Sequence, residues 1–312
     1  MSIEFTVFKG SASNGIIESK TLHEGPTGNQ VLVKITHSGI CFTDEHFRHA
    51  DMGLGHEGVG TVEQIGDRVS QFKIGDVVGW GYTHNTCGEC EQCLTGQEQY
   101  CQNKEEYGTH NLHQGSFGSH AIWNASFLFK VPEALAPEHA APLTCGGASV
   151  FEAIEHYNIR PTDRVGVVGV GGLGHLAIQF LAKMGSSVAV FSTTESKRDE
   201  ALSLDTFEGC APLDHLLVTS STLPDWKPFL KVMKPNSTIY PLTVSSGDLV
   251  IPMFPVARPS GRAVLRRMLE FAAQNHIAPI VERFPMTRSG VEEGLTRLGE
   301  GKMRYRGVLV AA

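Results

Sequence analysis

The fold is decided by residues 164–185, which read RVGVVGVGGLGHLAIQFLAKMG. The first seven residues are a short apolar run that predicts a buried strand, and the residues from Leu173 onward carry apolar side chains at helical spacing. A second apolar strand is predicted at 187–192. Strand, turn, helix and strand in this order predict a parallel, doubly wound unit of the α/β class.

The turn between the first strand and the helix contains four glycines in the pattern G-x-G-G-x-G. Glycines let a backbone approach a pyrophosphate closely, and the amino terminus of the helix stabilises its negative charge. The motif alone is a weak signal, but its position between strand and helix predicts a dinucleotide site. The residues of this site would be Gly169, Gly171, Gly172, Leu173 and Gly174. A glycine-rich turn without a ligand is the alternative.

The end of the second strand indicates which dinucleotide fits. A site for NAD usually has Asp or Glu there, to bind the ribose hydroxyls. Here hydroxyls and two cations follow instead, at Ser192, Thr193, Ser196, Lys197 and Arg198. These groups favour a 2′-phosphate and hence NADP(H). An ordinary solvated helix start, with Glu195 in its first turn, is the alternative.

The flanking segments differ from this unit. Residues 1–145 predict short strands separated by turns, in an antiparallel, β-rich domain, for example Gln30–Thr36, Gly58–Ile65 and Asp76–Gly79. Beyond about residue 278 the chain predicts one more helix, Gly290–Leu298, and a closing strand, Gly307–Val310.

Composition excludes several classes of protein. The chain has 312 residues, 41% of them hydrophobic, and a net charge of −7, which gives no electrostatic reason to expect nucleic acid or an anionic membrane as a partner. No apolar run reaches the ~20 residues of a membrane span, and the amino terminus does not resemble a signal peptide. We therefore expect a soluble, cytoplasmic protein.

Four of the seven cysteines, Cys87, Cys90, Cys93 and Cys101, lie within fifteen residues in the pattern C-x2-C-x2-C-x7-C. In a chain without a secretory signal this spacing favours a metal cluster over disulfides. Four thiolates on one loop can close a tetrahedron around a structural Zn²⁺. An iron–sulfur cluster and unliganded thiols are the alternatives.

A second set of metal ligands is dispersed along the chain. Cys41, His56 and Cys145 would supply two thiolates and an imidazole, which are ligands of a catalytic zinc that keeps a fourth position open. From spacing alone, Cys41 and Cys145 could equally be small buried hydrophobic residues.

Several motifs together resemble the zinc-dependent medium-chain alcohol dehydrogenases. In chain order they are GICFTDEH from Gly39, GHEGVG from Gly55, Gly75-Asp76, the four-cysteine loop, TCGG from Thr144 and GVGGLGH from Gly169. Within that family the chain is similar to the cinnamyl alcohol dehydrogenase-like subfamily, because of Ser192-Thr193, Ser196-Lys197-Arg198 and the segment KMRYRG from Lys302.

The resemblance implies roles for the residues of the dispersed site. Cys41, His56 and Cys145 would bind the catalytic zinc, with Glu57 beside the metal as a candidate transient ligand. Asp44 would orient His56.

It also implies a proton relay. Thr43 would hydrogen-bond the substrate oxygen, and His46 would be the outer member of the relay. Arg306 would contact the cofactor phosphates, with Arg304 as a competing candidate.

The family's fold implies a GroES-like zinc-binding catalytic domain at 1–150, a Rossmann NADP-binding domain at 151–277 and a return to the catalytic domain at 278–312. The expected enzyme holds two Zn²⁺ per subunit and transfers a hydride between NADP(H) and an alcohol/aldehyde pair, with aldehyde reduction as the expected direction. A biosynthetic reductase of C=N or conjugated C=C bonds and a catalytically impaired zinc-binding homologue are the alternatives.

Two segments depart from the family. Four strands can be predicted at 164–170, 187–192, 215–220 and 237–244, whereas a doubly wound unit needs about six. Residues 205–213 are too few for a strand with a crossover helix, and three prolines interrupt 248–260. We therefore expect a shortened sheet with an exposed edge near 237–244, and this puts the homodimer expected from the family in doubt.

The substrate is not specified by any motif. Four aromatic residues could line its pocket or belong to the core, namely Trp80, Tyr82, Phe117 and Trp123.

Overall fold

The structure is a computed structural model, and it describes residues 2–13, 15–192, 211–243, 248–251, 262–277, 279–303 and 306–311. The chain divides into two compact units, Met1–Ile251 and Pro252–Ala312. In the described ranges no helix is long and apolar enough to cross a membrane.

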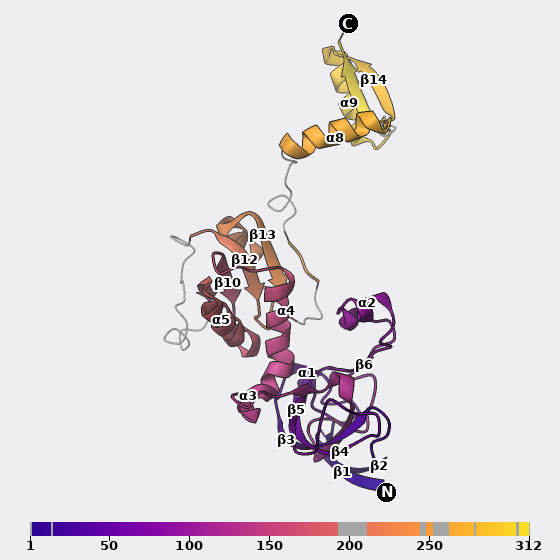
Figure 1. The fold of residues 1–312 in the computed structure, drawn as a ribbon. Coiled ribbons are helices and arrows are strands. Elements are labelled where there is room, and N and C mark those ends of the chain that lie inside the picture. Colours follow the sequence, from indigo (N-terminus) through magenta and orange to yellow (C-terminus); the bar gives the residue numbers. More distant parts are fainter. Residues whose placement is uncertain are drawn as a thin grey trace. The chain divides into compact units, whose positions relative to one another are not determined.

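The amino-terminal part is built from antiparallel strands, as predicted (Figure 1). A hairpin of β1 (Ser2–Lys9) and β2 (Ile17–Glu24) comes first. A five-stranded sheet follows in the order β8-β3-β4-β5-β9, whose members are β3 (Gln30–Ser38), β4 (Gly58–Ile65), β5 (Val77–Trp80), β8 (His120–Asn124) and β9 (Phe129–Lys130). A short pair, β6 (Thr83–Asn85) and β7 (Glu105–Glu106), begins and ends the cysteine-rich segment.

The core of this part contains two of the four aromatic residues considered for a substrate pocket. Trp80 and Trp123 have exposed fractions of 0% and 3%, and their rings lie 5.3 Å apart in the cluster around Val31 and Val33. Both are therefore core residues and do not line a pocket.

Three consecutive helices lead from this part to the parallel sheet. They are α3 (Pro137–Pro142), the π-helical turn η3 (Leu143–Gly147) and α4 (Ala148–His156). Ala140 and Ala141 of α3 pack against Val59 of β4, whereas Val150 and Ile154 of α4 pack beneath the parallel sheet. The π-helical turn carries Cys145, and such turns occur frequently at functional sites.

The second part of the first unit is the predicted doubly wound sheet. Its strands run parallel in the order β11-β10-β12-β13, with β10 (Arg164–Val168), β11 (Ser187–Phe191), β12 (Leu213–Val218) and β13 (Met233–Pro241). Helices α4 and α5 (Gly172–Met184) pack on one face, and α6 (Trp226–Val232) packs on the other. Because helices cover both faces, the central parts of β10, β11 and β12 are apolar and buried.

The described residues contain four strands of this sheet, the number that the sequence predicted, and most of residues 205–213 and 248–260 lie outside them. The four strands lie where the sequence predicted them, although β13 begins four residues earlier than expected. In this part of the chain β11 and β13 are the edge strands. The helix expected after Phe191 and the proline-rich stretch 252–260 lie outside the described residues.

The unit Pro252–Ala312 contains α8 (Arg262–Gln274), β14 (Val281–Pro285), α9 (Arg288–Gly299) and β15 (Arg306–Val310) (Figure 1). The two strands are parallel and α9 connects them, so this is a strand–helix–strand unit. The sequence predicted α9 and β15 to within two residues but did not predict α8 or β14.

Candidate metal and cofactor sites

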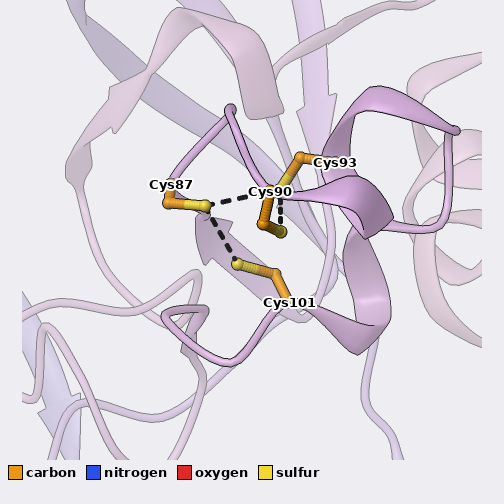
Figure 2. Close-up of side chains that lie close together, drawn as sticks. All are labelled: Cys87, Cys90, Cys93 and Cys101. Atoms are coloured by element: carbon orange, nitrogen blue, oxygen red, sulfur yellow. Dashed lines mark hydrogen bonds between the residues drawn. The ribbon is translucent and has the colours of Figure 1, made fainter.

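The four cysteines of the C-x2-C-x2-C-x7-C loop converge on one point (Figure 2). The Sγ atoms of Cys87 and Cys101 lie 3.6 Å apart, those of Cys87 and Cys93 3.9 Å, and those of Cys90 and Cys93 3.5 Å. Cys90 and Cys93 are brought together because α2 (Glu91–Leu94) begins directly after Cys90.

These distances fit a tetrahedral metal and exclude disulfides. Four sulfurs at ~2.3 Å from a central zinc are about 3.8 Å from one another, whereas bonded sulfurs are about 2.0 Å apart. Six cysteines lie in the described ranges and all are free thiols; the seventh, Cys210, lies outside them. The site suits zinc in charge and geometry.

The dispersed ligands also come together. Donor atoms of Cys41, His56, Glu57 and Cys145 all lie within 4.8 Å of one another, and His56 Nε2 is 3.3 Å from Cys145 Sγ. Cys41 is the residue before α1 (Phe42–His46), and Cys145 comes from η3. Two thiols, an imidazole and a carboxylate are the donor set of a catalytic zinc site.

Asp44 orients this site, as the resemblance implied. One of its carboxylate oxygens accepts a hydrogen bond from His56 Nδ1 at 2.8 Å, and the other accepts one from the backbone N–H of Cys41 at 2.9 Å. Both side chains are almost fully buried. The bond to Nδ1 directs His56 Nε2 toward the thiols, and Asp44 contacts both His56 and the backbone of Cys41.

The protonation of these groups indicates a need for positive charge. A hydrogen bond from Cys145 lowers the pKa of Cys41 to about 3, and the shared bond together with burial raises the pKa of Cys145 far above its usual range. Burial lowers the pKa of His56, but hydrogen bonds to Asp44 and Cys41 raise it to about 9 overall. The ionised forms of these buried groups need a nearby positive charge, which a divalent metal would supply.

Glu57 lies beside the candidate ligands, in space that is left open by Gly39. Sequence analysis gave this glycine no role of its own. The side chain is 3% exposed, and its carboxylate lies against Gly39, where an added Cβ would fall 1.8 Å from Glu57 Oε2. Burial and the nearby Cys41 charge raise the pKa of Glu57 to about 7. Only glycine at position 39 leaves room for this carboxylate.

The two relay residues lie on one short helix. Thr43 Oγ1 is 3.5 Å from Cys41 Sγ, at the edge of the metal cluster. His46, at the end of α1, is exposed and its ring lies edge-on to Phe42 at 5.0 Å. The structure therefore brings Thr43 to the cluster and places His46 on the surface of the same helix.

The glycine-rich turn has the geometry of a pyrophosphate cradle. Gly169 has a positive φ of 90°, and an added Cβ would fall 2.9 Å from the Cα of Ser220. A Cβ on Gly174 would fall 2.0 Å from the carbonyl oxygen of Gly169. At Gly171 and Gly172 no atom of another described segment lies within 4 Å of the Cβ position, so the turn is open there. The start of α5 lacks a side-chain cap and suits an anion.

Thr219 fixes this turn and was missed by sequence analysis. It follows β12, and its hydroxyl lies 2.9 Å from the carbonyl oxygen of Val168 and 3.0 Å from that of Gly169. The strand order reverses between β10 and β12, and ligands of doubly wound folds bind at such a switch point. The cradle therefore lies where this fold binds dinucleotides.

The predicted contacts to the rest of the cofactor are not assembled by the described residues. Ser192 ends the segment after β11, whereas Thr193, Ser196, Lys197 and Arg198 lie outside the described residues. Arg306 is the first residue of β15, in the other unit, where it borders an apolar pocket. Its competitor Arg304 is also outside the described residues.

Comparison with known proteins agrees with this geometry. Residues 27–133 match the model of the alcohol dehydrogenase GroES-like domain. The aldehyde reductase AdhA of Synechocystis is 31% identical, with 95% of this chain and 96% of that protein aligned. Cinnamyl alcohol dehydrogenase 1 of Ocimum basilicum is 31% identical, over 92% of this chain and 90% of its own.

Among solved structures, the cinnamyl alcohol dehydrogenase of Helicobacter pylori, complexed with NADP(H), has a TM-score of 0.74 at 25% identity, covering 99% of this chain and 98% of that one. The alignment with the Synechocystis protein runs over 326 positions, more than the 312 residues of this chain, so the chain lacks residues that its relative has. With two Cys/His clusters, a GroES-like domain and this identity over nearly its whole length, the chain belongs to the zinc-dependent medium-chain alcohol dehydrogenases and is similar to their cinnamyl alcohol dehydrogenase-like members.

Proposed function

We propose that this protein is an NADP(H)-dependent, zinc-requiring reductase of aldehydes. The observation that carries the proposal is the hydroxyl of Thr43 beside a cluster of two thiols and an imidazole. Each of the two described clusters would hold one Zn²⁺, which gives two Zn²⁺ per chain. The substrate is a small alcohol or aldehyde, and free thiols in both clusters suit a reducing compartment such as the cytoplasm.

The protein's own groups would position substrate and protons. Zinc held by Cys41, His56 and Cys145 would supply Lewis acidity toward a carbonyl oxygen, and NADPH would supply the hydride. Thr43 would hydrogen-bond that oxygen and pass a proton to it, and His46 would exchange the proton with solvent, because its ring is exposed. Glu57, whose pKa is raised to about 7, would lie beside the three ligands and would bind the metal transiently.

The NADP(H) preference rests on the strand end after Phe191, where a hydroxyl and not a carboxylate follows. Ser192, Ser196, Lys197 and Arg198 would bind the 2′-phosphate, and Arg306 would contact the cofactor phosphates. The glycines of the turn and Leu173 would hold the pyrophosphate, as the open cradle supports.

The test combines cofactor binding with turnover of the zinc-loaded protein. NADPH fluorescence should change on mixing, and a benzaldehyde-type substrate should then consume NADPH. Thr43→Val should lower kcat by ~100-fold or more while leaving NADPH binding unchanged, and Thr43→Ser, which keeps the hydroxyl, should retain most of the activity. Binding without turnover of any aldehyde would favour the impaired homologue, and turnover only of C=N or conjugated C=C substrates would favour the biosynthetic reductase.

A further inference from the structure

We infer that Tyr107 is a positioning residue of the catalytic metal site, acting through Asp44 and the backbone before His56. Neither the motifs nor the four candidate ligands point to this residue. It lies in the turn after β7, far in sequence from both groups that it joins. The inference rests on the zinc site of the proposed function.

The hydroxyl of Tyr107 lies between two parts of the site. The backbone N–H of Gly55, the residue before His56, donates to Tyr107 Oη at 3.0 Å. The hydroxyl's own proton is then available to the nearby Asp44 carboxylate, whose charge acts on Tyr107.

Asp44 lies among three of these groups. It accepts hydrogen bonds from His56 Nδ1 and from the backbone N–H of Cys41, in a position only 4% exposed, and its charge acts on Tyr107. The same hydroxyl fixes the backbone that carries His56. Tyr107 consequently couples the orientation of the imidazole to the position of the carboxylate.

Packing fixes the ring of Tyr107 in this place. It is 2% exposed and belongs to a cluster with Met52 and Leu54. The ring lies 4.8 Å from that of His56 and meets Phe47 edge-on at 5.3 Å. Phe47 also fills the space beside the next residue, because a Cβ on Gly108 would fall 2.3 Å from its ring. The ring therefore cannot turn its hydroxyl away from Asp44 without repacking this cluster.

The experiment removes the hydroxyl and keeps the ring. Zinc-loaded wild type, Tyr107→Phe and Asp44→Asn are titrated with a competing chelator, and the zinc lost from each cluster is measured. Tyr107→Phe should weaken zinc binding at the Cys41 cluster by ~10–100-fold, the range seen when outer partners of metal ligands are removed, and should leave the four-cysteine zinc in place. The exposed Tyr100→Phe is the matched control and should not change either site.

A spectroscopic readout separates positioning from general stability. With Co²⁺ exchanged into the Cys41 cluster, Tyr107→Phe should alter the visible cobalt bands, and the double variant with Asp44→Asn should resemble Asp44→Asn alone. If Tyr107→Phe does not fold, 3-fluorotyrosine at position 107, which changes only the donor strength, must shift the same bands.

Unchanged cobalt bands and zinc affinity within twofold of the wild type would overturn the role of Tyr107. A wild type that binds zinc only at the four cysteines would instead refute the proposed function.

Discussion

A methyl group on Gly171 tests whether the glycine-rich turn holds a cofactor. Among the residues that the structure describes, none beyond its chain neighbours has an atom within 4 Å of the position that its Cβ would take. The backbone there has φ −112° and ψ −153°, an extended conformation that alanine adopts without strain. Gly171→Ala should therefore leave the fold intact and even stabilise it by ~0.4–1 kcal/mol, because it restricts the unfolded chain. The methyl group would instead contact a cofactor bound in the turn and weaken its binding.

Gly174→Ala is the contrasting variant, because its methyl group meets the protein itself. The added Cβ would fall 2.0 Å from the carbonyl oxygen of Gly169 and 2.7 Å from Thr219 Oγ1, against an ordinary contact of 3.4 Å or more. The carbonyl is backbone and cannot rotate away, so α5 must move off the sheet. Such overpacking costs about 1–3 kcal/mol of the free energy of unfolding.

The assay measures two quantities for both variants, urea unfolding without cofactor and NADPH binding by fluorescence. Gly171→Ala should keep its unfolding free energy within ~1 kcal/mol of wild type and bind NADPH at least tenfold more weakly, a loss of ~1.4 kcal/mol. Gly174→Ala should lose both stability and binding. Wild-type NADPH affinity in Gly171→Ala would refute the cradle.

The other predictions concern metals, cofactor choice, pH and assembly. Elemental analysis should find two Zn²⁺ per chain; Cys93→Ser should lose one of them with much of the stability, and Cys145→Ser should lose the other and keep the fold. The kcat/KM ratio should favour NADPH over NADH by at least ~10-fold, since one charge-assisted hydrogen bond contributes ~1.5–3 kcal/mol. His84 is 5% exposed, and burial, followed by the charge of His110, lowers its pKa to about 4. Between pH 7 and 5 the unfolded chain therefore binds a proton at His84 that the folded protein does not, and the free energy of unfolding should fall by ~2 kcal/mol. In His84→Gln, the free energy of unfolding measured with urea should fall by ~2 kcal/mol less between pH 7 and 5 than in the wild type. Sedimentation should find weak or no dimerisation, with turnover below the ordinary ~1–1000 per second; a stable, fully active dimer would contradict this.

The strand and the helix on either side of the glycine-rich turn could be predicted from local sequence patterns. The apolar run around Val165 and the helical spacing after Leu173 depend only on neighbouring residues. Strand β10 begins at Arg164 as predicted, and α5 begins one residue before Leu173. Helix α8 was not predicted, because it follows closely after the proline-rich stretch 248–260, where regular structure is disfavoured. Strand β14 was missed because its five residues, VERFP, include two charges and a proline.

The metal ligands could be predicted because thiols and imidazoles are chemically distinctive and stand in recognisable motifs. The residues that support them carry no such signal. Gly39 acts by leaving room for the Glu57 carboxylate, and Thr219 acts through a hydrogen bond to a backbone carbonyl. Tyr107 is separated from Asp44 by 63 positions in the sequence. Only the folded chain shows which tyrosine or threonine lies beside which ligand.

A shortened sheet, as the sequence predicts, would affect the two halves of the proposed function unequally. The cradle is built from the ends of β10 and β12, the two inner strands of the described sheet, and Thr219 joins them. Losing strands beyond β11 or β13 leaves these contacts intact, so phosphate binding should persist. In the described part of the chain β13 is an edge strand, and its Met233–Asn236 half is largely exposed. If no further strand follows β13, the nicotinamide end of a cofactor would be held less firmly than the pyrophosphate. Because loose positioning of a hydride donor lowers rate more than affinity, we expect NADPH to bind well and to react slowly.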